Sequence, residues 1–248
     1  MRVGEGVGGA YGNGASSVTG TLHGVGLGPG APDLVTLRAA RLIEGARVIA
    51  YPAPEGGESF ARSIAAALVP AAAREIRMDV PMTRERAPAQ RAYDRGAAAV
   101  AAALMGGDDV VCLCEGDPLL YGSFMYLAAR LRPRFDVRVV PGVTSLAAAA
   151  AAAGRPLAAR DETLAVLPGT LSDDALRPRL RATDSVALMK VGRHLPRLRA
   201  LLGAEGFDGA YVERATLGTE RVLPLAEAPA AAPYFSLILA AKGADPWT

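Results

Sequence analysis

The sequence predicts an α/β fold made of two α/β domains, the first with a mostly parallel sheet and the second with a mixed sheet. Two observations support this prediction. Between residues 23 and 153, short apolar segments alternate with longer segments of helical length, a pattern typical of parallel sheets covered by helices on both faces. After residue 162, the last apolar segments follow one another too closely for helical crossovers, which favours antiparallel pairing.

The first half of the chain is expected to alternate strictly between strand and helix. Alanine runs at residues 97–103 and 147–153 favour helix. A glycine loop at residues 26–32 joins the first strand to the first helix. The expected strands are residues 23–27, 47–51, 75–79, 110–114 and 137–140, and the expected helices are residues 36–44, 59–69, 87–105, 122–131 and 145–153.

The second half is expected to contain fewer helices than strands. Helices separate its earlier strands, and its later strands are joined by short connections. The expected strands are residues 164–167, 186–190, 210–214, 220–224 and 234–240, and the expected helices are residues 174–180 and 196–202.

These elements divide the chain into an N-terminal α/β domain, residues 21–155, and a C-terminal α/β domain, residues 156–248. Residues 1–20 are rich in glycine and lack the apolar core of a signal peptide, so we expect a disordered tail. No apolar segment approaches the roughly 20 residues that span a bilayer. We therefore expect a soluble, cytoplasmic protein without a membrane partner.

Composition narrows the classes of function. The 27 basic and 25 acidic residues are mixed along the chain and give a net charge of +2, so we expect no nucleic-acid partner. Cys112 and Cys114 would share one face of a strand, where neighbours rarely meet disulfide geometry. With only His23 and His194 besides, the sequence contains no cluster with zinc-ligand spacing, and we expect no metal site.

The glycine loop matches the dinucleotide fingerprint G-x-G-x-x-G/A at Gly26, Gly28 and Ala31. That fingerprint also needs an acidic residue at the end of the second strand, but this strand ends in Tyr51 and Pro52. In addition, Pro29 removes a backbone N–H from the loop. The glycines therefore indicate either a tight turn or the close approach of some other ligand.

Four further loops follow predicted strands, and ligands of open α/β sheets bind beyond the carboxyl ends of strands. Their small residues and backbone groups would suit an adenosine, although each loop alone is also typical of an ordinary turn. Glu115 and Asp117 could form an acid/base pair, or Asp117 could cap a turn. Ser123 and Ser145 lack a histidine partner, which argues against a serine hydrolase. The loops are EGDPLLYGS (115–123), PGVTS (141–145), MKVGR (189–193) and YVERAT (211–216).

Taken in order over residues 21–241, these segments resemble the tetrapyrrole methylase family of S-adenosylmethionine-dependent methyltransferases. The resemblance implies a homodimer whose cofactor, S-adenosyl-L-methionine, lies in the cleft between the domains. It also implies that the EGDP, PGVTS, MKVGR and YVERAT loops contact the cofactor. The implied cofactor-binding residues are Pro29, Glu115, Gly116, Asp117, Leu120, Thr144, Ser145, Met189, Ala215 and Ser236.

The segments ESFARSIAAAL, MKVGRHLPRLR and PYFSLIL further resemble the branch of the family that methylates carbon 20 of precorrin-2. That substrate is a flexible disk rimmed by carboxylates, which arginine forks would bind. The implied proton-handling residues are Glu115, Tyr121 and Glu213. The candidate substrate-binding residues are Arg84, Arg86, Arg91, Arg193 and Arg214.

Several alternatives stay open at this point. Cobalt-factor II would undergo the same chemistry, and other branches of the family methylate other substrates. A nicotinamide oxidoreductase or a scaffold without activity are hypotheses from different classes. Residues 218–221, Gly-Thr-Glu-Arg, depart from the glutamine expected there, which puts local contacts in doubt.

Overall fold

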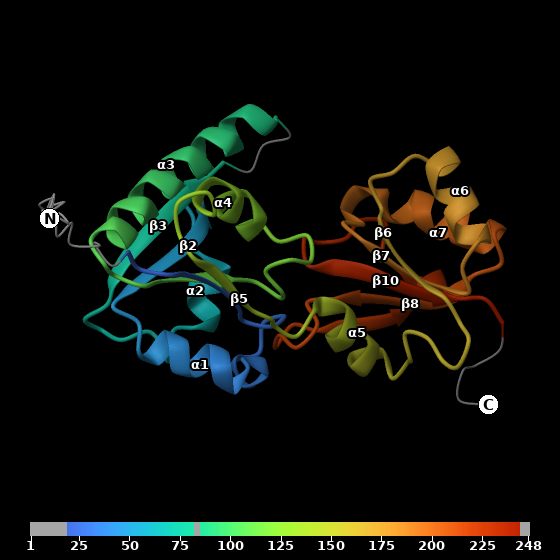
Figure 1. The fold of residues 1–248 in the computed structure, drawn as a ribbon. Coiled ribbons are helices and arrows are strands. Elements are labelled where there is room, and N and C mark those ends of the chain that lie inside the picture. Colours follow the sequence, from blue (N-terminus) through green and yellow to red (C-terminus); the bar gives the residue numbers. More distant parts are fainter. Residues whose placement is uncertain (1–18, 82–84, 244–248) are drawn as a thin grey trace, which may run out of the picture.

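The computed structural model of the chain describes residues 19–81 and 85–243, and the predicted tail lies outside these ranges except for its last two residues. The described part forms two sheets side by side, each covered by helices (Figure 1). The first sheet is entirely parallel, with the order β3-β2-β4-β1-β5. Its strands are β1 (Leu22–Gly26), β2 (Val48–Pro54), β3 (Arg74–Val80), β4 (Val110–Cys114) and β5 (Val137–Val140).

Helices cover both faces of the first sheet, and the central strand β4 has apolar side chains pointing to both of them. Val110, Cys112 and Cys114 pack toward helices α3 and α4, whereas Val111 and Leu113 pack toward α1 and α2. This alternation follows the two-residue period of a strand. The helices are α1 (Leu37–Glu44), α2 (Phe60–Ile64), α3 (Arg86–Met105) and α4 (Phe124–Leu131), so α2 is shorter than the predicted helix 59–69.

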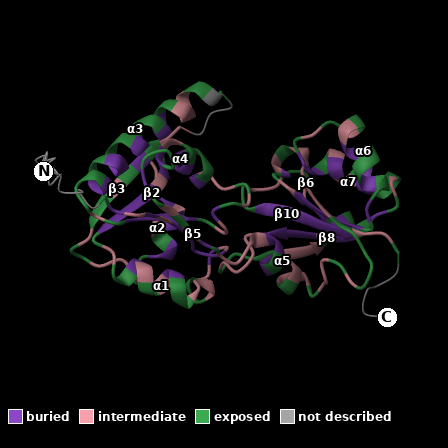
Figure 2. Ribbon diagram, in the orientation of Figure 1, coloured by how far each residue is buried: buried purple, intermediate pink, exposed green. Residues whose placement is uncertain are grey.

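The second sheet is mixed, as predicted. Its order is β6-β7-β10-β8-β9, with β6 and β7 parallel and the other pairs antiparallel. Figure 2 shows that the inner strands of both sheets, such as β4 and β10, are buried, whereas the edge strands, such as β3 and β9, are mostly exposed or half-buried. The strands are β6 (Leu164–Pro168), β7 (Ser185–Met189), β8 (Asp208–Glu213), β9 (Arg221–Pro224) and β10 (Ser236–Ala241), and the helices on one face are α6 (Asp173–Arg181) and α7 (Leu195–Ala204).

Helix α5 (Ser145–Ala153) covers the other face of the second sheet, although it precedes that sheet in the chain (Figure 1). Its residues Leu146 and Ala149 pack with Val212 and Leu237. The chain therefore passes from the first sheet to the second between β5 and α5, ahead of the division predicted after residue 155. A helix composed almost entirely of alanine has no polar stripe to indicate which sheet it covers.

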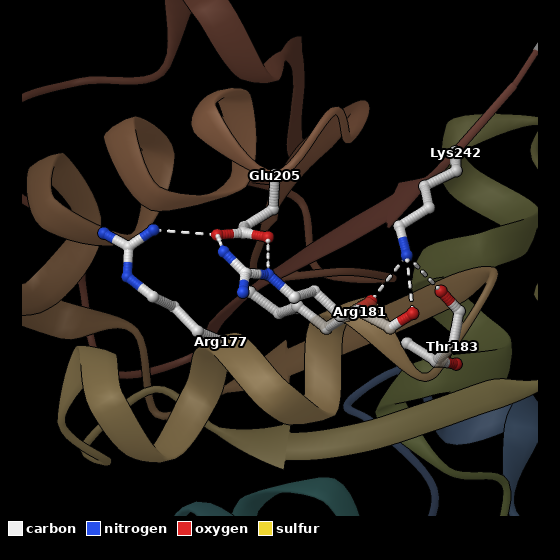
Figure 3. Close-up of polar contacts among 6 residues, drawn as sticks. Arg177, Arg181, Thr183, Glu205 and Lys242 are labelled. Carbon is white, nitrogen blue, oxygen red and sulfur yellow. Dashed lines mark hydrogen bonds and ion pairs between the residues drawn. The ribbon is translucent and has the colours of Figure 1, made fainter.

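Polar contacts fix the outer end of the second half (Figure 3). Glu205 accepts hydrogen bonds from Arg177 at 2.7 Å and from Arg181 at 2.9 Å, although only 7% of its side chain is exposed. Lys242 Nζ donates to the carbonyl oxygens of Leu180 and Thr183 at 2.7 and 2.9 Å. Lys242 thus adds a charged donor to backbone carbonyl groups at and just beyond the end of α6.

No helix in the two described ranges has the combination of length and apolar character that crossing a bilayer requires. Residues 19–81 and 85–243 also contain three short 3-10 helices. They are η1 (Pro32–Leu34), η2 (Gly192–His194) and η3 (Leu225–Glu227).

Candidate active site

The carboxyl ends of the strands from both sheets meet at one junction. Strands β1, β4 and β5 end there from the first sheet, and β7 and β8 end there from the second. Leu120 of the first half packs in one apolar cluster with Met189 and Ala215 of the second. The backbone N–H of Ala31 also donates to Thr216 Oγ1 at 3.1 Å. The loops predicted from the sequence therefore come together in space.

Three glycines allow the backbones of the first half to approach closely at this junction. A Cβ atom at Gly142 would lie 2.1 Å from the carbonyl oxygen of Gly116, and one at Gly26 would lie 2.5 Å from the nitrogen of Gly142. The glycine loop joins the same group, because Gly116 N donates to Gly28 O at 2.8 Å. Only residues without a side chain fit at Gly26 and Gly142.

Asp117 holds two of these loops together. Its Oδ1 accepts a hydrogen bond from Leu119 N at 2.9 Å, and its Oδ2 accepts one from Gly142 N at 3.1 Å. The bond from Leu119 N is a turn cap, one of the two alternatives that the sequence left open for Asp117. Gly116, beside it, has φ +62°, and a Cβ there would meet no atom within 4 Å. The loop is thus fixed on one side and faces open space on the other.

The other residues predicted to bind a cofactor border the same junction. Thr144 caps α5 by accepting a hydrogen bond from Ala147 N at 3.3 Å, and Ser145 begins that helix. Pro29 is half-buried next to Gly28, which pairs with Gly116 through backbone hydrogen bonds. Ser236 is buried at the start of β10. Their positions are compatible with a bound ligand, and their contacts with it stay predictions.

Backbone strain concentrates at the junction. Four residues other than glycine have positive φ there: Tyr121 at 54°, Lys190 at 56°, Arg214 at 51° and Thr216 at 71°. Such conformations cost about 1–3 kcal/mol each and cluster at functional sites. Lys190 Nζ also lies 5.3 Å from the centre of the Tyr121 ring, so a cation–π contact joins the two halves.

Glu115 has an exposed side chain and a raised pKa. Its side chain is reached by solvent, yet surrounding protein atoms displace part of its hydration, and this desolvation raises the pKa of Glu115. Desolvation also raises the pKa of Tyr234, and the negative charge of Glu115 raises it further. Tyr234 precedes β10 and was not singled out by the sequence. The two side chains therefore interact across the junction.

Glu213 lies in a different environment from Glu115. It is buried, and its carboxylate accepts a hydrogen bond from the hydroxyl of Tyr211, which lies 3.2 Å from Ser236 Oγ. Burial, and after it the hydrogen bond to Glu213, together raise the pKa of Tyr211 to about 12. Sequence reasoning missed Tyr211, although its spacing of two residues from Glu213 places both on one face of a strand.

The predicted substrate-binding arginines are only partly brought together. Arg214 is half-buried at the end of β8, and Arg193 is exposed in η2. Arg91 is exposed on α3. Arg84 lies outside the described residues, and Arg86 begins α3 with a side chain that is likewise outside the description.

The junction combines glycine backbone and small side chains with the carboxylates of Glu115, Asp117 and Glu213. In the part of the chain that the structure describes, no group of three or more histidine, cysteine or acidic residues is arranged to hold a metal ion.

Comparison with known proteins gives a consistent result. The family of Tetrapyrrole (Corrin/Porphyrin) Methylases matches residues 21–229. The chain is 43% identical over 238 residues to the cobalamin biosynthesis protein CobIJ of Mycobacterium tuberculosis, a match covering 92% of this chain and 47% of that protein. The chain thus spans about half the length of this relative.

Two further relatives match along nearly their whole length. The precorrin-2 C(20)-methyltransferase of a Sinorhizobium species is 42% identical, covering 89% of this chain and 94% of that protein. The cobalt-precorrin-2 C(20)-methyltransferase of Salmonella typhimurium is 34% identical, covering 91% and 98%. Among solved structures, the Thermus thermophilus uroporphyrin-III C-methyl transferase complexed with S-adenyl homocysteine superposes with a TM-score of 0.65 at 28% identity, covering 90% and 97%.

Proposed function

Because the chain belongs to the tetrapyrrole methylase family, we propose that it is an S-adenosyl-L-methionine-dependent C-methyltransferase that methylates carbon 20 of precorrin-2 to give precorrin-3A in cobalamin biosynthesis. The observation that carries this proposal is the 42% identity to the Sinorhizobium precorrin-2 C(20)-methyltransferase along 94% of that protein.

The residues of the junction fit the proposed cofactor. Gly116 leaves open space beside its Cα, and Asp117 fixes the loop so that its backbone groups stay in place. Thr144, Met189 and Ala215 complete the proposed binding residues from both halves. An adenosine needs apolar walls and a few placed polar groups, which these loops offer.

The proposed reaction depends on alignment more than on a strong base. S-adenosyl-L-methionine supplies a sulfonium methyl group to an electron-rich bridging carbon of the macrocycle, and neutral S-adenosyl-L-homocysteine is released. The chain's own task is to hold the two molecules in line and to exclude water. The close backbone packing of Gly26 and Gly142 serves that task.

A proton acceptor is needed only if the methylated macrocycle loses a proton. Among the predicted proton-handling residues, Glu115 is the best placed, because its carboxyl group is exposed at the junction and its pKa is raised by desolvation. Tyr121 borders the same space. Glu213 is less suited to the role, since it is buried and already accepts a hydrogen bond from Tyr211.

Cobalt-factor II of the anaerobic route is the alternative substrate. The 34% identity to the Salmonella cobalt-precorrin-2 C(20)-methyltransferase supports this alternative. Incubation of the purified chain with S-adenosyl-L-methionine and each macrocycle under anaerobic conditions would separate the two. We expect mass spectrometry to show that one methyl group is added to precorrin-2 faster than to cobalt-factor II. Absence of methylation on both macrocycles would reject the proposed substrates.

We further propose that the protein is a cytoplasmic homodimer, which is what the family resemblance implies. Size-exclusion chromatography with light scattering would test the dimer, since a chain of 25.5 kDa is expected to elute at twice that mass. A monomeric mass at assay concentrations would contradict this part of the proposal.

A further inference from the structure

Exposed apolar side chains gather on two segments at the junction. One segment connects β4 to α4 and continues into that helix, and the other immediately precedes β10. Tyr234, in the second segment, is 71% exposed, and its neighbour Phe235 is 36% exposed. Clustered exposure of large apolar residues marks a binding surface, whereas scattered single residues do not. The exposed members of the first segment are Leu119, Tyr121, Met125 and Tyr126.

The segment with Tyr234 is held firmly despite its exposure. The Phe235 ring lies 4.6 Å from the ring of Phe60 in α2, which belongs to the first half. The carbonyl oxygen of Phe235 accepts a hydrogen bond from Arg214 N at 2.7 Å. Pro233 also restricts the backbone just before the aromatic pair. An exposed aromatic ring on a fixed support loses little conformational freedom when a ligand covers it.

The Tyr234 ring lies edge-on to Phe235, with ring centres 5.0 Å apart. The part of Tyr234 that this contact leaves exposed is available for another flat group. The contacts of the adjacent Phe235, with Arg214 in the second half and Phe60 in the first, place this ring beside the proposed reaction site.

Positive charge accompanies the aromatic surface. The Arg214 backbone is bonded to Phe235, and no carboxylate among the described residues pairs with its guanidinium group. Lys190, on the neighbouring loop, contacts the ring of Tyr121. An apolar, aromatic surface bordered by Arg214 and Lys190 matches a flat conjugated ligand that carries carboxylates on its rim.

We propose that Tyr234, supported by Phe235 and Phe60, is a substrate-positioning residue whose ring lies against the face of the tetrapyrrole, with Arg214 beside it to bind a rim carboxylate. This inference rests on the proposed function and deepens it. It assigns to the segment before β10 a role that none of the predicted site residues covers.

The test compares Tyr234→Ala and Tyr234→Phe with the unmodified chain. The readouts are the dissociation constant of anaerobically prepared precorrin-2, titrated by its visible absorbance with S-adenosyl-L-homocysteine present, and that of S-adenosyl-L-homocysteine alone by calorimetry. Leu164→Ala is the matched control, because this exposed residue begins the edge strand β6, at the end of the second sheet remote from the start of β10.

We expect Tyr234→Ala to weaken precorrin-2 binding by about tenfold, the size of effect that losing one aromatic contact and its buried area gives. Tyr234→Phe should bind within about twofold of the unmodified chain, because the ring and not the hydroxyl makes the contact. Binding of S-adenosyl-L-homocysteine and the thermal midpoint should stay unchanged in both variants, as should all readouts of the control.

Equal precorrin-2 binding by Tyr234→Ala and the unmodified chain would overturn the inference. An equal loss in Tyr234→Ala and Tyr234→Phe, or a parallel loss of S-adenosyl-L-homocysteine binding, would also overturn it. Failure of the proposed function is recognised separately: the unmodified chain would then bind precorrin-2 without methylating it, and weaker binding by Tyr234→Ala would still support the positioning role. If the unmodified chain does not bind precorrin-2 at all, both proposals fail.

Discussion

Replacing Gly142 with alanine tests whether the close packing of loops builds the site. The backbone of Gly142 does not have positive φ, so alanine adopts its conformation without strain. The added methyl group would nevertheless lie 2.1 Å from the carbonyl oxygen of Gly116 and 2.9 Å from the backbone of Gly26. Both neighbours are backbone atoms, which cannot rotate away as a side chain can.

The stability lost in Gly142→Ala has two parts. Overpacking a tight site typically costs about 1–3 kcal/mol. Moving the loops apart also weakens the hydrogen bond from Gly142 N to the Asp117 carboxylate, and hydrogen bonds to charged groups contribute about 1.5–3 kcal/mol. A single movement of the two loops apart would relieve the overlap with Gly116 and also stretch the hydrogen bond to Asp117. The two costs therefore do not add in full, and we expect the free energy of unfolding to fall by about 2–4 kcal/mol. For a chain of this size, that lowers the thermal midpoint by roughly 5–15 °C.

Differential scanning calorimetry measures the midpoint, and isothermal titration measures S-adenosyl-L-homocysteine affinity, which should fall at least about tenfold as the loop moves. Gly203→Ala is the control, because a Cβ there meets nothing within 4 Å and alanine favours the helix α7. This variant should be as stable as the unmodified chain or slightly more so. An unchanged midpoint and an unchanged affinity in Gly142→Ala would refute the reasoning.

Three further substitutions test contacts in the second half. Tyr211→Phe leaves the carboxylate of Glu213 buried without its donor, so chemical denaturation should show a loss of about 1–3 kcal/mol. Lys242→Met removes the ammonium group from the carbonyls at the end of α6 and should lower the unfolding free energy by about 1–3 kcal/mol. Glu205→Gln should lower the thermal midpoint at neutral pH, because Arg181 and Arg177 depress the pKa of Glu205 and stabilise its charged form.

The sign of the last effect follows from linkage. A depressed pKa gives stability that is present above the ordinary pKa of a carboxyl group and is lost as the pH falls through the lowered value. The difference between Glu205→Gln and the unmodified chain should therefore disappear in acid, and a difference that persists there would contradict the ion-pair explanation. Ser236→Ala, which keeps the bond between Tyr211 and Glu213, should cost less than Tyr211→Phe, and the reverse order would contradict the assigned partners.

Much of the fold follows from patterns that a single sequence contains. Strand β4 is predictable because Val110 to Cys114 is apolar throughout and is followed by a turn sequence, and the structure buries it on both faces. The place of α5 was not predictable, because an alanine helix packs equally well on either sheet. The end of α2 was also missed, since Ala65 to Leu68 favour helix but form turns ahead of Pro70.

The site was predictable to the extent that it follows strand ends. The loop organiser Asp117 could be inferred because an Asp-Pro pair after a buried strand is a turn signal. Tyr211 and Tyr234 were missed for a physical reason: their roles depend on partners in other strands and in the other half of the chain. Glu213 was implied as a proton-handling residue by the resemblance, and its buried partner Tyr211, whose hydroxyl donates to its carboxylate, is visible only in three dimensions.

The proposed function depends on transfer of a methyl group by this chain to one bridging carbon of the macrocycle. The most direct test incubates the purified chain anaerobically with precorrin-2 and S-adenosyl-L-methionine carrying a carbon-13 methyl group, and locates the label by nuclear magnetic resonance. We predict one labelled methyl group, attached to carbon 20. A label at any other position, or no label on the macrocycle at all, would contradict the account.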